Sequence, residues 1–366
     1  MTTDQPVRIG VIGGGFGVQH LQGFGVTENA EVVAFCQRTR DKAEAMAGKF
    51  GVPHVYTDYR ELLAHEGLDA VSIVAPPHLH AEMTAAALEN GLHALCEKPL
   101  AMNAAEAEAM LEQAEAAGRV HMTAFNHRHI PALAYMKELM DGGYVGERVL
   151  HVESRWFGET RLAPDQTHYW RHARELAGFG ILGDIGVHVV DRLRWLIGEF
   201  ESVWGHADTF IPERKDDRGV SRAVTVDDNF TLFGRLAGGA SACIRLSGVA
   251  RKSNYQNLEI YGDAGMLRFA FDRNVEGWIR GQLWGARGDT RSPEPLEIPE
   301  RYTRGLDPSD PQRAQGEFIF AALTRVFVDA IRNGAPASPS FADGLAAQRV
   351  LDAALHAAEE GQWVRV

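Results

Sequence analysis

Short apolar runs alternate with helical patterns through the first third of the chain. The run Val7–Ile12 leads into a glycine-rich loop, Gly13 to Gly17, and helical spacing follows through Leu21 and Phe24. Similar runs predict strands at residues 31–36, 70–74, 93–96 and 121–125, with helices at residues 41–50, 80–90 and 103–117. Strands buried on both faces and joined by helices indicate a parallel, doubly wound sheet. We therefore expect an α/β domain at residues 1–125.

The pattern changes after residue 125. A helix near residues 131–140 precedes segments in which apolar and polar positions alternate, at residues 148–157, 230–236, 240–247 and 258–261. This alternation is typical of half-exposed strands, so residues 126–366 are predicted to form an α+β domain with a large, mostly antiparallel open sheet. The segments without periodicity, which predict loops or edge extensions, are residues 208–226 and 284–307. Amphipathic helices are expected at residues 317–333 and 341–361.

Composition and charge narrow the class of partner. The 366 residues include 37 Lys and Arg against 49 Asp and Glu, and this formal net charge of −12 repels nucleic acid and anionic membranes. A small molecule is therefore a better candidate for the binding partner than nucleic acid or a membrane. Cys36, Cys96 and Cys243 lie in apolar runs and are expected to be buried free thiols in a reducing compartment. Residues 1–6 show no signal region and no segment approaches a membrane span, so a cytoplasmic location is expected.

The glycine-rich loop is the first candidate for function. Its pattern Gly13-x-Gly15-x-x-Val18 nearly matches the dinucleotide fingerprint of Rossmann domains. In that fingerprint, glycines allow a tight turn and let a pyrophosphate approach backbone N–H groups at a helix N-terminus. Val18 replaces the third glycine, and Gly17 comes one residue early. Because a predicted strand precedes the loop and a predicted helix follows it, we expect the loop to bind a dinucleotide.

The end of the second predicted strand bears on which dinucleotide is bound. NAD enzymes usually place an acid there, about 20 residues after the loop, to accept the ribose hydroxyls. This chain has Gln37 followed by Arg38. Gln37 does not repel a 2′-phosphate, and Arg38 can pair with one while stacking on adenine, which favours NADP over NAD. The alternative is that Arg38 only covers adenine in an NAD site.

Recognisable motifs follow one another along the whole chain. They are Gly13 to His20, Pro76-Pro77-His78-Leu79-His80, Glu97-Lys98-Pro99-Leu100-Ala101, Phe125-Asn126-His127-Arg128, Trp170-Arg171, Gly180-Ile181-Leu182-Gly183-Asp184-Ile185-Gly186-Val187-His188, Glu259 to Gly265, and Ala358 to Val364. In this order they resemble the glucose-fructose oxidoreductase and inositol dehydrogenase family, the Gfo/Idh/MocA group. Val18 and Gln37 depart from its pattern. The resemblance implies an NAD(P)-dependent oxidoreductase acting on a hydroxyl or keto group of a sugar, cyclitol or related polyol, and a homodimer or homotetramer.

The motifs and the resemblance together assign site residues. Expected cofactor contacts are Gly13, Gly15, Phe16, Gly17, Gln37, Arg38, Pro76, Pro77, His80, Glu97, Lys98, Asn126, Trp170 and Arg171. Expected substrate contacts are Lys98, Arg128, Trp156, Tyr169, Asp184 and His188. Packing in the core is an alternative for each of the two aromatic residues. The resemblance also implies that the peptide between Lys98 and Pro99 is cis.

Asp184 and His188 have a spacing that suits catalysis. Residues four apart share one face of a helix, so a carboxylate and an imidazole are expected where one substrate hydroxyl meets both. The alternatives are that Asp184 is a helix N-cap after Gly183 and that His188 is structural. With Lys98 in the same chain, we assign His188 as general base, Lys98 as the cation that polarises the reacting oxygen, and Asp184 as the group that orients the hydroxyl and tunes Lys98. An exchange of roles between His188 and Lys98 is a further alternative.

Other hypotheses fit the sequence less well. The histidine pairs His78/His80 and His127/His129 lack matching cysteine or acidic ligands, so no metal is expected. One alternative function is a glycosidase or lyase that retains NAD and oxidises its substrate transiently. A ligand-sensing relative without catalysis is disfavoured, because such a protein would be expected to lose the three catalytic candidates.

One face of the second-domain sheet is expected to form an oligomer contact. That face has Phe230, Leu232, Ala242 and Ile244 at alternating positions. We expect it to pack against its counterpart in a second copy of the chain. The alternative is that helices of the same chain cover it.

Overall fold

The computed structural model describes residues 5–163, 166–275 and 277–366. It divides into two compact units, unit 1 (residues 1–129 and 312–346) and unit 2 (residues 130–311 and 347–366). The first break along the chain lies close to the expected domain boundary after residue 125. Residues 312–346 differ from the expectation, because they belong to unit 1 and not to the second domain.

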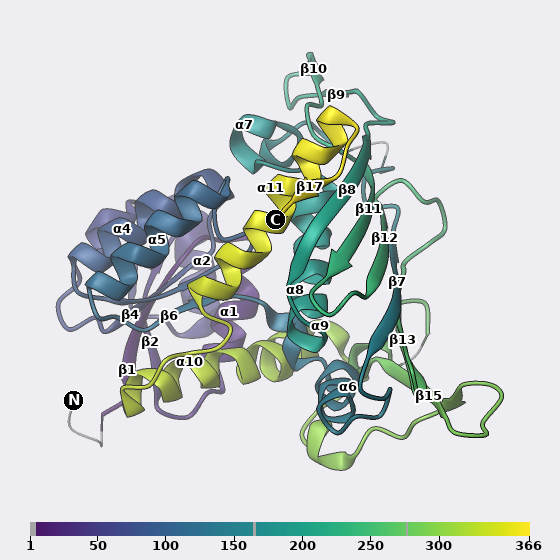
Figure 1. The fold of residues 1–366 in the computed structure, drawn as a ribbon. Coiled ribbons are helices and arrows are strands. Elements are labelled where there is room, and N and C mark those ends of the chain that lie inside the picture. Colours follow the sequence, from purple (N-terminus) through teal and green to yellow (C-terminus); the bar gives the residue numbers. More distant parts are fainter. Residues whose placement is uncertain (1–4, 164–165, 276) are drawn as a thin grey trace. The chain divides into compact units, whose positions relative to one another are not determined.

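Unit 1 is built on a six-stranded parallel sheet with the order β3-β2-β1-β4-β5-β6, which is the order of a Rossmann fold (Figure 1). The strands are β1 (Val7–Ile12), β2 (Ala30–Cys36), β3 (His54–Tyr56), β4 (Ala70–Ile73), β5 (His93–Cys96) and β6 (His121–Thr123). The helices are α1 (Gly17–Gly25), α2 (Arg40–Phe50), α3 (Tyr59–Leu63), α4 (His80–Glu89), α5 (Ala104–Ala116) and α10 (Ala321–Asn333), with short turns η1 (Pro77–Leu79) and η2 (Asn126–His129) and a π-helical turn η7 (Gln315–Phe320).

Helices cover both faces of this sheet, as the buried strands require. One core contains side chains of α3, α4 and α5, among them Leu62, Met83 and Met110. The other contains side chains of α1, α2 and α10, among them Phe24 and Phe327. The predicted doubly wound α/β class is confirmed.

Residues 312–346 join unit 1 because the apolar face of α10 and the turn before it pack on α1. A Cβ added to Gly23 would lie 3.0 Å from the backbone of Phe320, so the missing side chain allows the close approach. The hydroxyls of Thr27 and Thr324 are 2.7 Å apart in the same contact. An amphipathic pattern predicts the helix, which ends before Gly334 as expected, but it does not say which sheet the helix covers.

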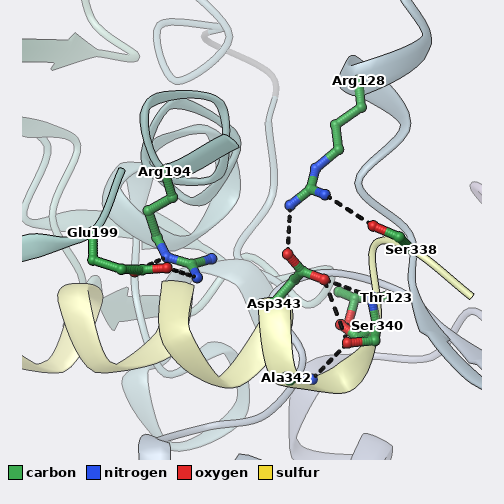
Figure 2. A network of polar contacts seen from close by, with 8 residues as sticks. All are labelled: Thr123, Arg128, Arg194, Glu199, Ser338, Ser340, Ala342 and Asp343. Carbon is green, nitrogen blue, oxygen red and sulfur yellow. Dashed lines mark hydrogen bonds and ion pairs between the residues drawn. The ribbon is translucent and has the colours of Figure 1, made fainter. Parts of the chain in front are cut away.

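A partly buried ion pair holds the far end of residues 312–346 in place (Figure 2). The Nη2 of Arg128 donates to Oδ1 of Asp343 at 2.9 Å. The other oxygen of Asp343 accepts the backbone N–H of Ser340 at 2.7 Å. Ser340 in turn accepts, through its carbonyl, a hydrogen bond from the Thr123 hydroxyl at the end of β6. Asp343 lies in the first turn of α11 (Phe341–Glu360), so these contacts hold the start of that helix.

Unit 2 contains a nine-stranded sheet with the order β16-β15-β14-β13-β7-β12-β11-β8-β17. Its strands are β7 (Val149–Phe157), β8 (Phe200–Asp208), β11 (Asn229–Leu236), β12 (Ser241–Ser247), β13 (Tyr255–Gly262), β14 (Gly265–Asp272), β15 (Gln282–Arg287), β16 (Glu294–Pro295) and β17 (Val364–Arg365), and β9 (Glu213–Lys215) pairs separately with β10 (Ser221–Ala223). The helices and turns are α6 (Pro131–Asp141), η3 (Trp170–His172), α7 (Arg174–Ala177), η4 (Leu182–Gly186), α8 (Val187–Leu196), η5 (Trp278–Arg280) and η6 (Glu300–Tyr302). Of the short helix α9 (Pro311–Ala314), only Pro311 belongs to unit 2. β7 and β12 run parallel within an otherwise antiparallel ladder, so the predicted mostly antiparallel sheet is confirmed.

The segments expected to be loops or edge extensions contain some of these strands, and β16 is an edge strand of the nine-stranded sheet. Residues 208–226 include β9 and β10, and residues 284–307 include most of β15 and all of β16. These strands are short or contain small residues such as Gly285 and Ala286, so their alternation is weak. Their pairing with neighbours makes them strands, and a local pattern does not report that pairing.

The sheet face that we expected to contact a second copy of the chain is covered within the single chain, so the choice of that face is wrong. Phe230, Leu232, Ala242 and Ile244 are buried within the single chain. The π-helical turn before α8 packs on this face, since a Cβ on Gly186 would lie 2.7 Å from Leu246 of β12. The opposite face of the same sheet has large exposed side chains, including Phe233 of β11 and Tyr261 of β13.

Two smaller expectations concern thiols and membrane spans. Cys36 and Cys96 are buried free thiols as expected, whereas Cys243 is only half-buried. In the described ranges, every helix is too short or too polar to cross a membrane.

Candidate functional site

The glycine-rich loop has the geometry that a dinucleotide needs. Gly13 has a φ of +114°, and a Cβ there would lie 2.0 Å from the carbonyl oxygen of Val74. Around Gly15 the described structure leaves open space, with nothing within 4 Å of an added Cβ. Because α1 begins two residues later, its first N–H groups adjoin this space. The loop therefore fits the pyrophosphate of a dinucleotide.

The side chain of Gln37 lies over this loop. A Cβ on Gly14 would be 2.6 Å from the Gln37 carboxamide carbon, so the amide occupies the space above the glycine. Arg38, one residue on, is exposed. An amide and a guanidinium thus stand at the end of β2, where an acid would accept ribose hydroxyls.

A buried polar network lies beneath the Glu97-Lys98-Pro99 motif. Nε2 of His20 donates to Oε1 of Glu97 at 3.0 Å, and Nδ1 of the same ring is 2.8 Å from the Ser72 hydroxyl. The second carboxylate oxygen accepts the backbone N–H of Lys98 at 3.0 Å. Burial raises the pKa of Glu97, but the His20 hydrogen bond and the nearby positive charges outweigh it, so the pKa is lowered overall. The network holds a charged carboxylate next to the half-buried Lys98.

His80 fastens the same motif to the neighbouring strand end. One ring nitrogen faces the carbonyl oxygens of Pro99 and Leu100 at 3.0 and 3.2 Å, and the other faces that of Ala75 at 2.8 Å. Burial lowers the pKa of His80, against the effect of these carbonyl contacts, which raise it. Both ring nitrogens thus face backbone carbonyls of the protein itself. The peptide between Lys98 and Pro99 is cis, as the resemblance implies.

Other expected residues of unit 1 are placed around these features. Pro76 caps the turn η1, Pro77 is buried within it, and Asn126 is buried in η2. Phe16 precedes α1 and packs edge-on against Phe320, with ring centroids 5.5 Å apart. Arg128, expected to contact substrate, forms the partly buried ion pair with Asp343 described above.

In unit 2, Asp184 and His188 lie on consecutive turns of one helical segment. Asp184 is inside the π-helical turn η4, and His188 is in the first turn of α8. The N-cap alternative for Asp184 is wrong, because the helical turn begins at Leu182 and the N–H of Asp184 already donates to the Gly180 carbonyl at 3.0 Å. π-Helical turns are rare and occur frequently at functional sites.

A buried carboxylate that the sequence did not single out starts this segment. Asp227 accepts the backbone N–H groups of Gly180 and Leu182, both at 2.8 Å. Burial raises its pKa against the effect of these hydrogen bonds. Gly180 must be a glycine, because an added Cβ would lie 1.8 Å from the Asp227 carbonyl oxygen. The sequence signal for this carboxylate was the pair Asp227 and Asp228 before the strand predicted at residues 230–236.

The buried residue Arg192 supports His188 from one turn further along α8. Its Nε donates to the His188 carbonyl oxygen at 3.2 Å and its Nη1 to Gln256 at 3.0 Å. Burial lowers the pKa of Arg192 to about 10, which leaves it protonated at neutral pH. The ring of His188 stacks on Trp156 with centroids 6.2 Å apart, and the Arg192 guanidinium is 5.7 Å from the same indole.

Asp184 lines a pocket of about 190 Å³ in unit 2. Trp156 and Tyr169, two of the expected substrate residues, line it as well, whereas His188 is not among the lining residues. Trp170 and Arg171 form a neighbouring cation–π pair, with 4.3 Å between the guanidinium and the ring centroid. The lining residues that the sequence did not suggest include Arg161, Gln166, Asn254 and Arg273. They come from segments between strands, where no periodic pattern marks them.

The histidine pairs do not form a metal centre in the described parts of the chain. There, no group of three or more His, Cys, Asp or Glu side chains is arranged to hold a metal ion. In the first pair, both ring nitrogens of His80 face backbone carbonyl oxygens.

The fold and the loop define the class to which the chain belongs. Residues 7–125 match the oxidoreductase family with an NAD-binding Rossmann fold, and residues 133–268 match the GFO/IDH/MocA C-terminal domain. The chain belongs to the GFO/IDH/MocA family of oxidoreductases, as the motifs predicted.

Particular relatives cover the chain from end to end. Levoglucosan dehydrogenase of Pseudarthrobacter phenanthrenivorans is 31% identical, over 99% of this chain and 98% of the relative. Myo-inositol 2-dehydrogenase of Thermotoga maritima is 28% identical, over 98% of each. Among solved structures, levoglucosan dehydrogenase in complex with NADH has a TM-score of 0.89 at 31% identity and 99% coverage of both chains.

Proposed function

We propose that the protein is an NAD(P)-dependent dehydrogenase or reductase that acts on a secondary hydroxyl, or the matching keto group, of a sugar, cyclitol or related polyol. The observation that supports this most is the pocket of unit 2, where the Asp184 carboxylate and the aromatic residues Trp156 and Tyr169 line one space. Aromatic faces and a hydrogen-bonding carboxylate suit a ring with several hydroxyls. The names of the relatives, levoglucosan dehydrogenase and myo-inositol 2-dehydrogenase, agree with that class.

Three side chains supply the acid–base chemistry in this proposal. His188 takes the proton of the hydroxyl, Lys98 stabilises the negative charge that develops on the oxygen, and Asp184 orients the hydroxyl and tunes Lys98. The Glu97 carboxylate accepts the Lys98 backbone N–H, and Arg192 donates to the His188 carbonyl. These hydrogen bonds fix the backbone of Lys98 and of His188. A bound nicotinamide would supply the hydride acceptor or donor.

The cofactor would lie along the carboxyl ends of the unit 1 strands. Gly13, Gly15, Phe16 and Gly17 would hold its pyrophosphate, and Pro76, Pro77, Glu97 and Asn126 would line the nicotinamide side, together with Trp170 and Arg171 of unit 2. His80 would act by fastening the Lys98 segment, since both its ring nitrogens face backbone carbonyls. Gln37 and Arg38 favour NADP over NAD, because neither repels a 2′-phosphate and Arg38 can pair with it. We also propose that the protein is a homodimer or homotetramer located in the cytoplasm.

One experiment tests the reaction directly. Purified protein is incubated with a panel of sugars and cyclitols, including levoglucosan and myo-inositol, and with NAD or NADP, while the absorbance of reduced nicotinamide is followed. Net reduction with at least one polyol is expected. A protein that retains tightly bound NAD and cleaves a glycoside without net reduction would instead be a glycosidase or lyase that oxidises transiently.

A further inference from the structure

Arg161 is the most deeply buried charged group that lines the pocket of unit 2. It is 5% exposed, and its Nη2 lies 3.5 Å from Oδ2 of Asp184. Its Nη1 is also buried and has no hydrogen-bond partner among the residues that the structure describes. A buried N–H donor of a charged group that stays unpaired is costly, so a partner from outside the chain is expected.

The backbone around Arg161 holds the side chain in place before any ligand arrives. The N–H of Arg161 donates to the Gly248 carbonyl at 2.9 Å, and its carbonyl accepts a hydrogen bond from Nη2 of Arg214. Arg214 also donates to the carbonyl of Gln166 at 3.1 Å. A Cβ on Gly248 would lie 2.5 Å from Cγ of Arg161, so the glycine admits the side chain. Such support is typical of groups that bind with a fixed geometry.

The ion pair with Asp184 favours a neutral ligand group at Nη1 of Arg161, although Arg273 is a second arginine among the lining residues. Asp184 neutralises the guanidinium, and the Asp227 carboxylate is close enough for the two charges to affect each other. His172, next to Arg161, has a pKa lowered to about 3 by burial and by the arginine charges, so it adds no positive charge. The Nη1 donors therefore suit a hydroxyl oxygen better than a second carboxylate.

We propose that Arg161 is a substrate-binding residue that donates a hydrogen bond from Nη1 to a neutral hydroxyl next to the one that Asp184 orients. Because Nη2 of Arg161 lies 3.5 Å from Oδ2 of Asp184, a hydroxyl at Nη1 would lie close to the hydroxyl at Asp184, as two hydroxyls on adjacent carbons do. The preferred substrate is then a vicinal diol whose second hydroxyl is free, not removed or alkylated. This inference rests on the proposed function and specifies its substrate class.

Two substitutions of Arg161 separate its roles. Arg161→Met removes the charge and both donors, whereas Arg161→Lys keeps a charge for Asp184 but loses the second planar donor. Arg304→Met is the matched control, because Arg304 is an exposed arginine of unit 2 that does not line this pocket. Melting temperatures show which variants fold, and Arg161→Lys remains informative if Arg161→Met does not.

The probes are levoglucosan, a ring with three contiguous free hydroxyls, its three monodeoxy analogues, and myo-inositol. Binding to the protein loaded with NADH or NADPH, whichever binds more tightly, is measured by calorimetry, so the readout does not depend on turnover. Wild type is expected to bind at least one deoxy analogue roughly 10- to 100-fold more weakly than levoglucosan, the size of a hydrogen bond from a charged donor. Arg161→Lys should bind levoglucosan more weakly and lose that discrimination, while Arg304→Met should match wild type.

The outcomes distinguish this inference from the proposed function. Wild-type discrimination in Arg161→Lys, or no binding of levoglucosan or myo-inositol by wild type, overturns the role of Arg161. Tighter binding of glucuronate than of glucose overturns the neutral partner. Binding that depends on Arg161 without any turnover would support the inference and count against the proposed reaction.

Discussion

His20 and Glu97, 77 positions apart in the sequence, form a buried hydrogen-bonded pair with 3.0 Å between Nε2 and Oε1. The pair joins the helix that follows the glycine-rich loop to the strand end that presents Lys98. A displacement of His20 would shift Glu97, and the reverse, so the pair couples the cofactor loop to the catalytic candidate Lys98.

Glu97→Gln should lower stability in a pH-dependent manner. Because its pKa is lower in the folded chain than its ordinary value of 4.5, Glu97 contributes stability above that value and loses it as the pH falls through the folded pKa. The variant should therefore unfold more easily than wild type at about pH 7, and the difference should shrink below about pH 4. Urea unfolding of both proteins across this range measures it. A difference that grows on acidification would contradict the assigned direction.

Lys98→Ala should lower turnover by about 10²–10³-fold, the usual cost of removing a donor that stabilises transition-state charge. Cofactor affinity should change far less, because the Glu97 contact to residue 98 uses the backbone N–H. Turnover and cofactor titration on the same preparations test this. Lys42→Ala, at an exposed position of α2, is the control and should behave as wild type. Full activity in Lys98→Ala would remove Lys98 from the mechanism.

Gly180→Ala should destabilise unit 2 and disturb the pocket. The new Cβ would lie 1.8 Å from the Asp227 carbonyl oxygen, and Asp227 holds the start of the segment that contains Asp184. Gly48→Ala is the matched control, since nothing lies within 4 Å of its added Cβ. In the interior of α2 that change should stabilise by roughly 0.5–1 kcal/mol. Denaturant titration measures the stability of both variants. Equal stability of the two would refute the expected clash at residue 180.

Phe233→Glu should dissociate the proposed homo-oligomer. Phe233 is 42% exposed on the outward face of β11 and packs against Trp204, with ring centroids 5.8 Å apart. A charge buried at such a contact lacks a partner and opposes association. Light scattering at micromolar concentration should show an oligomer for wild type and a smaller species for the variant. Val220→Glu, at a 49% exposed position away from this sheet, should leave the mass unchanged. A monomeric wild type would reject the oligomer.

The sequence predicted features that are local or repeated. Buried strands between helices gave the fold of unit 1, and glycines such as Gly13 and Gly334 marked turns, because these signals depend only on neighbouring residues. The partner of α10 and the face of the sheet that is covered were not predictable in this way. Both depend on contacts between segments far apart in the chain, such as Gly23 with Phe320.

The same limit applies to the candidate site. Lys98, Asp184 and His188 belong to motifs, so the sequence alone was enough to propose them. Arg161 and Asp227 act through contacts with Asp184 and with the backbone of Gly180, which only the folded chain brings together. His20 had a weak signal, as a polar residue on the apolar side of α1, but its partner Glu97 lies four strands later in the chain.

The last prediction concerns the choice of cofactor at Gln37 and Arg38. If Arg38 pairs with a 2′-phosphate, wild type should bind NADP more tightly than NAD. Arg38→Ala should then weaken NADP by roughly 1.5–3 kcal/mol, the scale of a charged hydrogen bond, and weaken NAD less.

Gln37→Asp is the complementary change. The amide of Gln37 lies over Gly14, so a carboxylate at this position would accept ribose hydroxyls and repel a phosphate. The preference should invert toward NAD. Arg40→Ala is the control, because Arg40 is exposed and pairs with Glu44 at 3.7 Å on α2. Titration of both cofactors against the four proteins measures these preferences. Equal or tighter binding of NAD by wild type would show that Arg38 only stacks on adenine, in line with the NADH complex of the similar levoglucosan dehydrogenase.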